Sequence, residues 1–339
     1  MRKEFFMACA LVLLPTSCGV PPPVAGSQMP GTMRRSSSSA YCLTSQCLYV
    51  LNAYDPAAVN IYRTDQHGPA KPIETISGAV TGLQSPDAVA VDANHNVYVA
   101  GSNYQYESFV TVYSAGDYGN IAPTQTIEGP DTQMGMVTGI AIDSARNIYV
   151  TNYFGGTPCV GSVTVYAAGA NGDAAPIAQI EGVKTHLCDP AGIAIDSSGN
   201  LYVTSGQQYS SAVNVYAAGS NGNVRPMAVI SGNRTLLYDP AGITLDAAGN
   251  IYVVGGELMK FKAGAHGNAK PQQAIAGILT KLEFPYGIAV NSKDEIYVNN
   301  TVRKDVVVFA SQATGDVPPI RIIRKDRRSI RRLTNIAIR

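Results

Sequence analysis

Short apolar segments recur along the chain from residue 47 onward, and each is bounded by Gly, Asn, Asp or Pro. The stretch 189–204, Asp-Pro-Ala-Gly-Ile-Ala-Ile-Asp-Ser-Ser-Gly-Asn-Leu-Tyr-Val-Thr, returns closely at 239–254. Weaker copies lie at 85–100, 137–151 and 284–299. Apolar runs of about four to eight residues between turn residues predict β-strands, so a repeated all-β unit is expected.

Each repeat contains four such segments, which we name strands A to D. Residues 192–196 are typical of strand A, 200–204 of strand B, 212–217 of strand C and 177–180 of strand D. Strand B carries a repeated tyrosine: Tyr49, Tyr98, Tyr149, Tyr202, Tyr252 and Tyr297. Strand C carries a repeated aromatic residue: Tyr62, Tyr113, Tyr166, Tyr216, Phe261 and Phe309. A glycine lies six positions after each strand C aromatic: Gly68, Gly119, Gly172, Gly222, Gly267 and Gly315. The counts agree on six units of about 50 residues, the size of a four-stranded propeller blade.

The two ends of the repeat region complete each other. Residues 47–50 match strand B with no strand A before them, and residues 333–338 match strand A with no strand B after them. Open sheet edges are prone to aggregation, and closing the ring removes them. We therefore expect an all-β, six-bladed β-propeller of four-stranded antiparallel blades over residues 42–339. Strand A at 333–338 is expected to join strands B to D at 47–76.

Composition supports this prediction. The 339 residues include 33 Gly and 20 Pro, and only 14% are charged, which favours short strands joined by turns and excludes a wholly disordered chain. The formal net charge of +1 gives no reason to expect nucleic acid as a partner.

The N-terminal sequence has the pattern of a secretory signal peptide. Two basic residues precede an apolar run at 5–14, which is too short to span a bilayer. The run ends at Pro-Thr-Ser-Cys18, which resembles a bacterial lipoprotein processing site. Residues 1–18 are thus interpreted as a signal peptide with lipidation at Cys18, and 19–41 as a flexible tether rich in Pro, Ser and Gly. We expect an exported lipoprotein facing the periplasm or cell surface; cleavage with secretion, or an uncleaved anchor, are the alternatives.

Export makes the remaining cysteines interpretable as disulfides. Cys42 and Cys47 are close in sequence, whereas Cys159 and Cys188 fall in loops that the propeller places on one face. Two bridges, 42–47 and 159–188, are therefore expected. A metal pair at Cys42 and Cys47 is disfavoured because no second Cys or His pair accompanies it.

The repeat Pro-Ala-Gly-Ile-Ala-Ile-Asp-x-x-Gly-Asn-Leu-Tyr-Val resembles the NHL repeat. It is more distantly similar to gluconolactonase-type and streptogramin-lyase propellers. The resemblance implies the fold and says little about activity, because such folds host unrelated functions.

Most repeated polar residues have an architectural explanation. Asp196 and Asn200 flank the A–B turn, where such side chains cap the backbone; a calcium loop is the alternative, although one carboxylate per turn is a poor cage. The repeated tyrosines are expected to be core. The threonine of the D–A loops, as in Thr185 and Thr235, is expected to make a structural hydrogen bond.

Strand direction divides the connections between two faces. The A–B and C–D turns share one, the turn face, and the longer B–C and D–A loops share the other, the loop face. Since loops on a rigid scaffold usually carry function, the loop face is the candidate binding face. The candidate ligand residues near its mouth are Asp87, Asn152, His186, Asp189, Asp239, Tyr286, Asn299 and Asn335.

These residues suggest a small polar ligand or one divalent cation, with Ca²⁺ or Mg²⁺ suiting oxygen ligands. The gluconolactonase resemblance implies a metal at the mouth, but its ligands do not align with this chain. We therefore assign no metal residues and expect no cofactor. His186 with Asp189 could form a catalytic base and its orienting group, although this spacing is common by chance.

A basic run near the C-terminus comprises Lys325, Arg327, Arg328, Arg331 and Arg332. The repeat alignment assigns residues 325–333 to the last D–A loop, on the loop face. The run could contact anionic glycan, lipid headgroups or an acidic partner, or it could simply be solvated.

The sequence favours a monomeric, non-catalytic binding or scaffold module in the cell envelope that recognises a protein, peptide or glycan and reaches the membrane through its lipid. The alternative is a propeller hydrolase or lyase, lactonase-like, with a divalent metal at the channel mouth. A binder should expose an apolar or charged patch on the loop face, whereas an enzyme should show a closed polar pocket.

Overall fold

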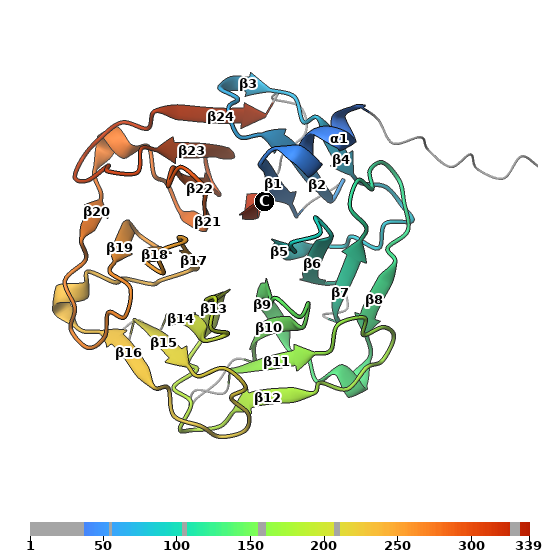
Figure 1. Ribbon diagram of the computed structural model, residues 1–339, viewed down its shortest axis with the longest axis horizontal. Helices are drawn as coiled ribbons and strands as arrows, with labels where there is room; N and C mark the ends of the chain where they lie inside the picture. The colour runs from blue at the N-terminus through green and yellow to red at the C-terminus, as the bar shows by residue number, and fades with distance from the viewer. Residues whose placement is uncertain (1–36, 54–55, 104–106, 155–160, 207–210, 326–332) are drawn as a thin grey trace, which may run out of the picture. The chain divides into compact units, whose positions relative to one another are not determined.

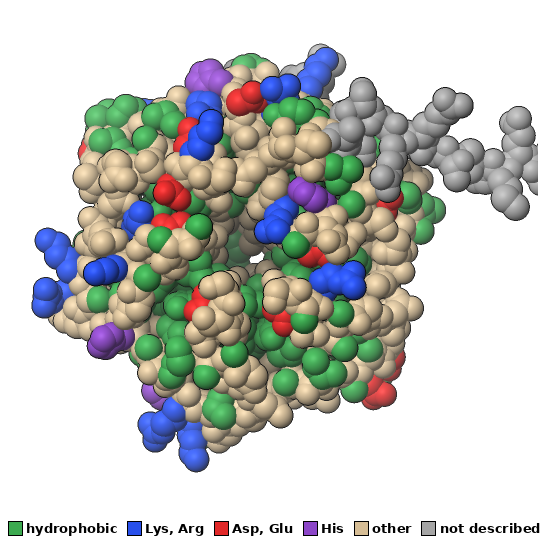
Figure 2. All heavy atoms as spheres, viewed as in Figure 1, with side chains coloured by type: hydrophobic (Ala, Val, Ile, Leu, Met, Phe, Trp, Pro, Cys, Tyr) green, Lys and Arg blue, Asp and Glu red, His purple; other side chains and the backbone are tan. Residues whose placement is uncertain are grey.

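The structure is a computed structural model that describes residues 37–53, 56–103, 107–154, 161–206, 211–325 and 333–339. Six antiparallel sheets surround a central channel, so the predicted six-bladed, all-β propeller is confirmed (Figure 1). The C-terminus lies at this channel. Figure 2 shows the channel opening at the centre of the viewed face, with charged side chains of both signs around it.

The blades share one strand order from the channel outward. Strand A is innermost: β25 (Leu333–Ile338), β5 (Pro86–Val91), β9 (Met136–Ile142), β13 (Pro190–Ile195), β17 (Gly242–Leu245) and β21 (Pro285–Val290). Strand B follows: β1 (Cys47–Asn52), β6 (Val97–Ser102), β10 (Ile148–Tyr153), β14 (Leu201–Ser205), β18 (Ile251–Val254) and β22 (Ile296–Asn300). Strand C is third: β2 (Ala58–Arg63), β7 (Ser108–Tyr113), β11 (Ser162–Tyr166), β15 (Ala212–Tyr216), β19 (Leu258–Phe261) and β23 (Asp305–Phe309). Strand D is outermost: β4 (Glu74–Ile76), β8 (Gln125–Glu128), β12 (Ala178–Glu181), β16 (Ala228–Ser231), β20 (Gln273–Ile275) and β24 (Arg321–Lys325). We number the blades 1 to 6 in this order, from the blade of β1 to that of β22.

Few other elements accompany these strands. Single turns of 3₁₀ helix lie in three D–A loops: η1 (Pro130–Thr132), η2 (Asn233–Thr235) and η3 (Ile278–Thr280). The described residues include one α-helix, α1 (Ser37–Thr44), which begins inside the segment expected to be tether and was not predicted. Within the described residues, none of the helices is both long and apolar enough to cross a bilayer.

The ring closes as the sequence predicts. β25 pairs antiparallel with β1, so that Ile336 lies opposite Val50 and Ile338 opposite Leu48. The Cys47 N–H donates to the Arg339 carbonyl at 2.7 Å, which extends the pairing by one residue. Strand A of blade 1 therefore comes from the opposite end of the chain.

Adjacent blades are joined by the repeated glycines, a role that the sequence did not reveal. The Gly119 N–H donates to the Thr75 carbonyl at 2.7 Å, and the Gly119 carbonyl accepts from Ser77 at 3.0 Å, so the C–D connection of blade 2 pairs with strand D of blade 1. Equivalent parallel bridges link Ile127 with Gly172, Ile180 with Gly222, Ile230 with Gly267 and Ile275 with Gly315. These glycines have φ between 62° and 78°, where a side chain would be strained.

The contact that joins blade 6 to blade 1 is longer than the contacts between the other blades. Residues Gly68–Ala70 form a strand, β3, that pairs in parallel with β24, so the sheet of blade 6 has five strands instead of the four expected. Each contact covers part of the outer edge of strand D, which would otherwise be an open sheet edge.

The repeated tyrosines lie in the core as predicted, although Tyr149 is only half-buried, and the threonines make the predicted structural hydrogen bonds. Tyr166 of strand C is fully buried, and its hydroxyl donates to the Thr132 carbonyl at 2.6 Å. The Thr132 hydroxyl in turn donates to the Gly129 carbonyl at 2.6 Å. The same threonine bond recurs in the other D–A loops that the structure describes, at Thr81, Thr185, Thr235 and Thr280. These residues hold the loops and are not exposed for a ligand.

Ring closure is tested by a large-to-small change in β25. Ile336 is 3% exposed, so Ile336→Ala should lower the free energy of unfolding by about 2–5 kcal/mol through lost burial and a cavity. Chemical denaturation measures this change. Ile177, 59% exposed, is the matched control, and Ile177→Ala should change stability by less than about 0.5 kcal/mol. Equal effects of the two substitutions would show that β25 is not part of the cooperative fold.

Candidate functional site

The A–B turns on the turn face are stabilised by their own aspartates. The Asp196 Oδ1 accepts hydrogen bonds from the backbone N–H groups of Ser198 and Asn200, each at 2.9 Å. The Asn200 amide and the Tyr202 hydroxyl donate to Asp196 Oδ2 at 2.9 and 3.3 Å. Partial burial by itself raises the pKa of Asp196, but these hydrogen bonds outweigh it and hold the pKa below its ordinary value. The predicted capping role is confirmed.

Blade 6 builds the same turn with the two residue types exchanged. Asn291 stands where the other turns have Asp, and Glu295 stands where they have Asn. The Asn291 amide donates to Glu295 at 2.7 Å, and Arg321 donates to both Glu295 carboxylate oxygens at 3.0 and 2.7 Å. The hydrogen bond from Arg321 is the main reason that the pKa of Glu295 lies below its ordinary value. The turn face is thus occupied by internal polar contacts.

On the loop face, a cavity of about 820 Å³ opens beside the channel mouth. It is lined by residues at or just before the start of strand A and at or just after the end of strand B in four consecutive blades, 3 to 6. Three of the predicted ligand residues, Asp189, Asp239 and Tyr286, line this cavity. We name it the mouth cavity.

The residue before strand A has the same unusual backbone in several blades. Asp189, Asp239 and Phe284 have φ values of 48°, 45° and 49°, and each is followed by proline. A residue before proline avoids helical conformations, and a positive φ is strained for side chains other than Gly, Asn and Asp. The backbone is repeated, whereas the side chain changes from carboxylate to phenyl in blade 6.

Glycines at the ends of strand B in blades 4 and 5 make room for Asp239. A Cβ at Gly206 would lie 2.8 Å from Asp239 Oδ1, and a Cβ at Gly255 would lie 2.4 Å from the Asp239 carbonyl. The position of Gly206 is occupied by Tyr153 in blade 3 and by Thr301 in blade 6. Small residues therefore form the middle of the cavity wall, and larger side chains form its sides.

Aromatic rings at this cavity are exposed to an unusual degree. Tyr238 is 70% exposed and Phe284 is 75% exposed, and both line the cavity. Tyr153 and Tyr286 line it as half-buried residues. Contiguous exposed apolar surface on a folded domain is typical of an interaction site.

The described lining contains three carboxylates, at Asp189, Asp239 and Glu283, and no Lys, Arg or His. Glu283 lies 3.6 Å from Arg303 just outside the lining. Neither Asp189 nor Asp239 has an ion-pair or side-chain hydrogen-bond partner within the described part of the chain. The cavity therefore combines negative charge with aromatic surface.

The other predicted ligand residues are not brought to the mouth cavity. Asn152 is fully buried, where its amide donates to Ser162 and Thr164 and its oxygen accepts from Gly135. Asn299 is also fully buried, with its Oδ1 accepting from the Gly287 N–H. These asparagines fill the ends of strand B.

Three further candidates lie apart from one another. His186 is exposed and lines a separate cavity of about 570 Å³ with Asn214 and Tyr238, whereas Asp189 does not line it, so nothing in the structure pairs His186 with Asp189. Asn335 lines the central channel, a space of about 310 Å³ enclosed by strands A. Asp87, the second residue of β5, is half-buried outside the mouth cavity.

The described residues include only some of the cysteines and basic residues that were predicted to matter. Cys42 and Cys47 form the expected disulfide, which ties α1 to the start of β1. Cys188 is disulfide-bonded, and its predicted partner Cys159 lies outside the described residues. Lys325 ends β24, which corrects its assignment to the last D–A loop, because the strand pairing extends through it. Arg327, Arg328, Arg331 and Arg332 lie outside the described residues, as does Cys18.

Sequence reasoning missed Tyr153, Tyr238, Glu283, Phe284 and the wall glycines. The signal for Phe284 was available, because a phenylalanine stands where the two closest repeats have aspartate. The role of Gly206 was not available, since it depends on a neighbouring blade. No group of three or more metal-ligating side chains is found within the described ranges.

Comparison with known proteins shows similarity in fold only. No protein-family model and no curated protein sequence matches the chain. A Bacteroides caccae protein of unknown function is similar with a TM-score of 0.58 and 13% identity, covering 87% of this chain and 99% of that one. The periplasmic gluconolactonase of Pseudomonas aeruginosa gives 0.57 and 12%, covering 86% and 98%. A Lactobacillus plantarum protein gives 0.55 and 12%, covering 87% and 99%.

The capped turns predict how stability depends on pH. The pKa values of Asp196, Asp246 and Glu295 are lowered in the folded state, so their stabilisation is complete above the unfolded carboxyl values of about 4 and is lost as pH falls through the lower folded values. Urea unfolding should therefore show a falling free energy below about pH 4. Asp196→Asn should be about 1–3 kcal/mol less stable at pH 7 and show a shallower fall. Parallel pH profiles for variant and wild type would contradict this origin.

Proposed function

We propose that this protein is an exported, lipid-tethered, non-catalytic binding module that holds a ligand in the mouth cavity. The observation that carries the proposal is the pair of aromatic rings, Tyr238 and Phe284, that stand mostly exposed in a cavity of about 820 Å³, whose carboxylates Asp189 and Asp239 have no ion-pair partner among the described residues. Such a volume suits a small molecule or one residue of a larger protein, peptide or glycan of the cell envelope. The propeller acts as the rigid frame.

Phe284 is the residue least explained by stability. A phenyl ring that is 75% exposed contributes little burial, and a positive φ before proline is strained by about 1–3 kcal/mol for a bulky residue. A residue that packs little and does not suit its backbone is best explained by contact with a partner. Phe284 is therefore assigned as a ligand-contact residue.

Binding is favoured over the lactonase-like alternative by the make-up of the lining. A metal-dependent hydrolase needs several oxygen or nitrogen ligands around one ion, and the three carboxylates of the described lining form no such group. Lactone hydrolysis is the second candidate function, because the name of the gluconolactonase with a similar fold states that activity.

Ligand binding is tested by thermal shift of the full-length protein in a non-ionic detergent, with chitotriose, triglycine and choline as probes. At least one probe should raise the melting temperature of the wild type and not that of Phe284→Gly. This variant should itself be equally stable or about 1 kcal/mol more stable, because glycine relieves the positive φ. Ile278→Ala is the control, since Ile278 is 85% exposed and outside the cavity.

Two results would overturn the binding proposal. One is the absence of any shift with all three probes. The other is hydrolysis of glucono-δ-lactone above the spontaneous rate that disappears in Asp239→Asn, which would assign the cavity to catalysis.

Export and lipidation rest on the N-terminal pattern at 1–18 and are supported by the Cys42–Cys47 disulfide, because disulfides persist mainly in oxidising compartments. Labelling of cells with radioactive palmitate should mark the wild type, and Cys18→Ser should lose the label and leave the membrane fraction. Cys9→Ser, within the apolar run, is the matched control and should keep the label. Absence of label in the wild type would show that the prediction of a lipid anchor is wrong.

A further inference from the structure

We propose that the mouth cavity recognises a quaternary ammonium group, such as the trimethylammonium of a choline-type compound. The inference rests on the proposed binding function and names its ligand class. It follows from three properties of the described lining: its uncompensated charge, its exposed rings and its stretch of alanine and glycine.

Charge is the first property. Asp189 and Asp239 come from the same Asp-Pro-Ala-Gly motif in blades 4 and 5, so the repeat brings two carboxylates to neighbouring positions of one cavity. No Lys or Arg stands among the lining residues that the structure describes, and Arg303, just outside the lining, lies 3.6 Å from Glu283 and 3.7 Å from Asp305. A cationic ligand would supply the missing charge, whereas a neutral one would leave both carboxylates uncompensated.

Aromatic surface is the second property. Phe284 and Tyr286 come from blade 6, Tyr153 from blade 3 and Tyr238 from the loop before blade 5, so rings border the cavity from different blades. The negative face of an aromatic ring attracts a cation, and clusters of rings are suited to quaternary ammonium groups. Two nearby carboxylates strengthen the same preference.

The third property separates a quaternary from a primary ammonium. A primary ammonium carries three strong donors and a tight water shell, so it needs several acceptors in exchange. Ala191, Gly206, Ala241 and Gly256 of the lining carry no side-chain donor or acceptor, so this part of the surface offers mainly van der Waals contact. A trimethylammonium group has no donors, and its methyl groups fit such a wall. A metal ion is disfavoured because the described residues supply no group of three ligands.

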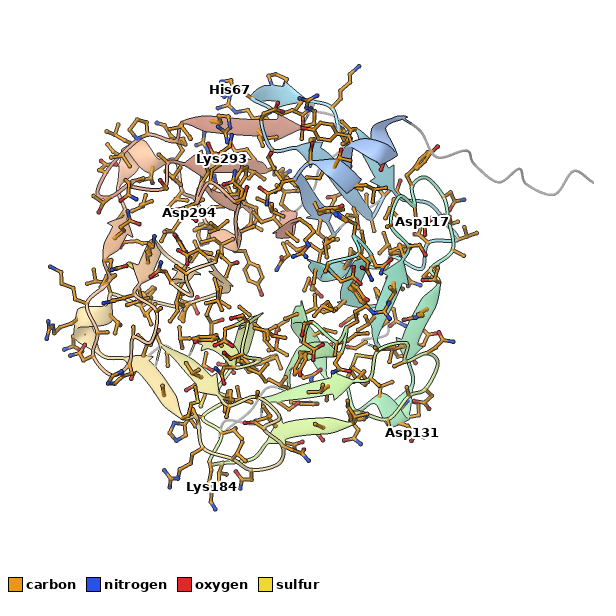
Figure 3. The ribbon with its side chains drawn as sticks, viewed as in Figure 1. His67, Asp117, Asp131, Lys184, Lys293 and Asp294 are labelled. Carbon is orange, nitrogen blue, oxygen red and sulfur yellow. A yellow bond between two sulfur atoms is a disulfide. The ribbon has the colours of Figure 1, made fainter. Side chains whose placement is uncertain are left out.

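The backbone supports the assignment of Asp239 as the charge-bearing contact. Its φ of 45° is one that Asp and Asn tolerate, and the absence of a side chain at Gly206 leaves space beside its carboxylate. Asp239→Asn therefore removes the charge without changing the backbone requirement. Asp131, an exposed aspartate that lies at the outer rim in Figure 3 and outside the cavity, offers the same substitution as a control.

The test is isothermal titration of the full-length protein in a non-ionic detergent with choline and with 3,3-dimethylbutan-1-ol, its uncharged carbon analogue. Choline should bind at least about tenfold more tightly than the neutral analogue, and added salt should weaken only choline. Asp239→Asn should weaken choline about tenfold and leave the neutral analogue unchanged, whereas Asp131→Asn should change neither. Phe284→Leu, which keeps apolar bulk without a ring, should weaken choline about fivefold.

Other outcomes overturn the inference. Equal binding of choline and the neutral analogue would remove the role of charge, and tighter binding of ethanolamine than of choline would assign a primary ammonium. Binding of chitotriose or triglycine with none of choline would leave the proposed binding function standing while rejecting this ligand class. If Asp131→Asn weakened choline binding as much as Asp239→Asn does, the effect would come from the overall charge of the protein and not from a contact in the mouth cavity.

Discussion

The pairing of β25 with β1 is the contact on which the rest of the molecule depends. It supplies blade 1 with its innermost strand and brings Arg339 to within hydrogen-bond distance of Cys47. A propeller blade packs against two neighbours, so a ring with one incomplete blade would leave two sheet faces and an edge exposed. The mouth cavity spans four blades, and its carboxylates and rings keep their relative positions only while the ring is closed.

Around this closure the described part of the chain repeats the same contacts from blade to blade. A glycine at positive φ bridges to the preceding strand D, a threonine closes the described D–A loops, and an aspartate caps the A–B turns of blades 2 to 5, with Asn291 in its place in blade 6. These contacts explain most of the conspicuous repeated residues. The candidate site lies where the repeat varies, at Tyr153, Gly206, Gly256 and Phe284. A uniform backbone with varied side chains lets one half of the mouth differ from the other without weakening the scaffold.

The residue before strand A shows how stability and recognition meet. Asp189 and Asp239 suit a positive φ better than most residues, so the repeat accommodates them at small strain. Phe284 occupies the same backbone with a bulky ring that stays 75% exposed. Strained backbone persists where the surrounding structure over-determines it, and such residues cluster at binding sites. The packed ring of blades holds the backbone of Phe284 at its positive φ, because the neighbouring residues do not relax to relieve the strain.

The sequence by itself determined the number of blades, the four strands in each, the closure through 333–338 and the Cys42–Cys47 bridge. These follow from local patterns, since strand period, turn residues and short cysteine spacing act within one repeat. Only the tertiary structure decided that Asp189 and Asp239 share a cavity while Asn152 is buried and His186 lies in another cavity. Which way a strand end faces, and whether the next blade leaves space beside it, depends on packing between blades, and no single repeat encodes that packing.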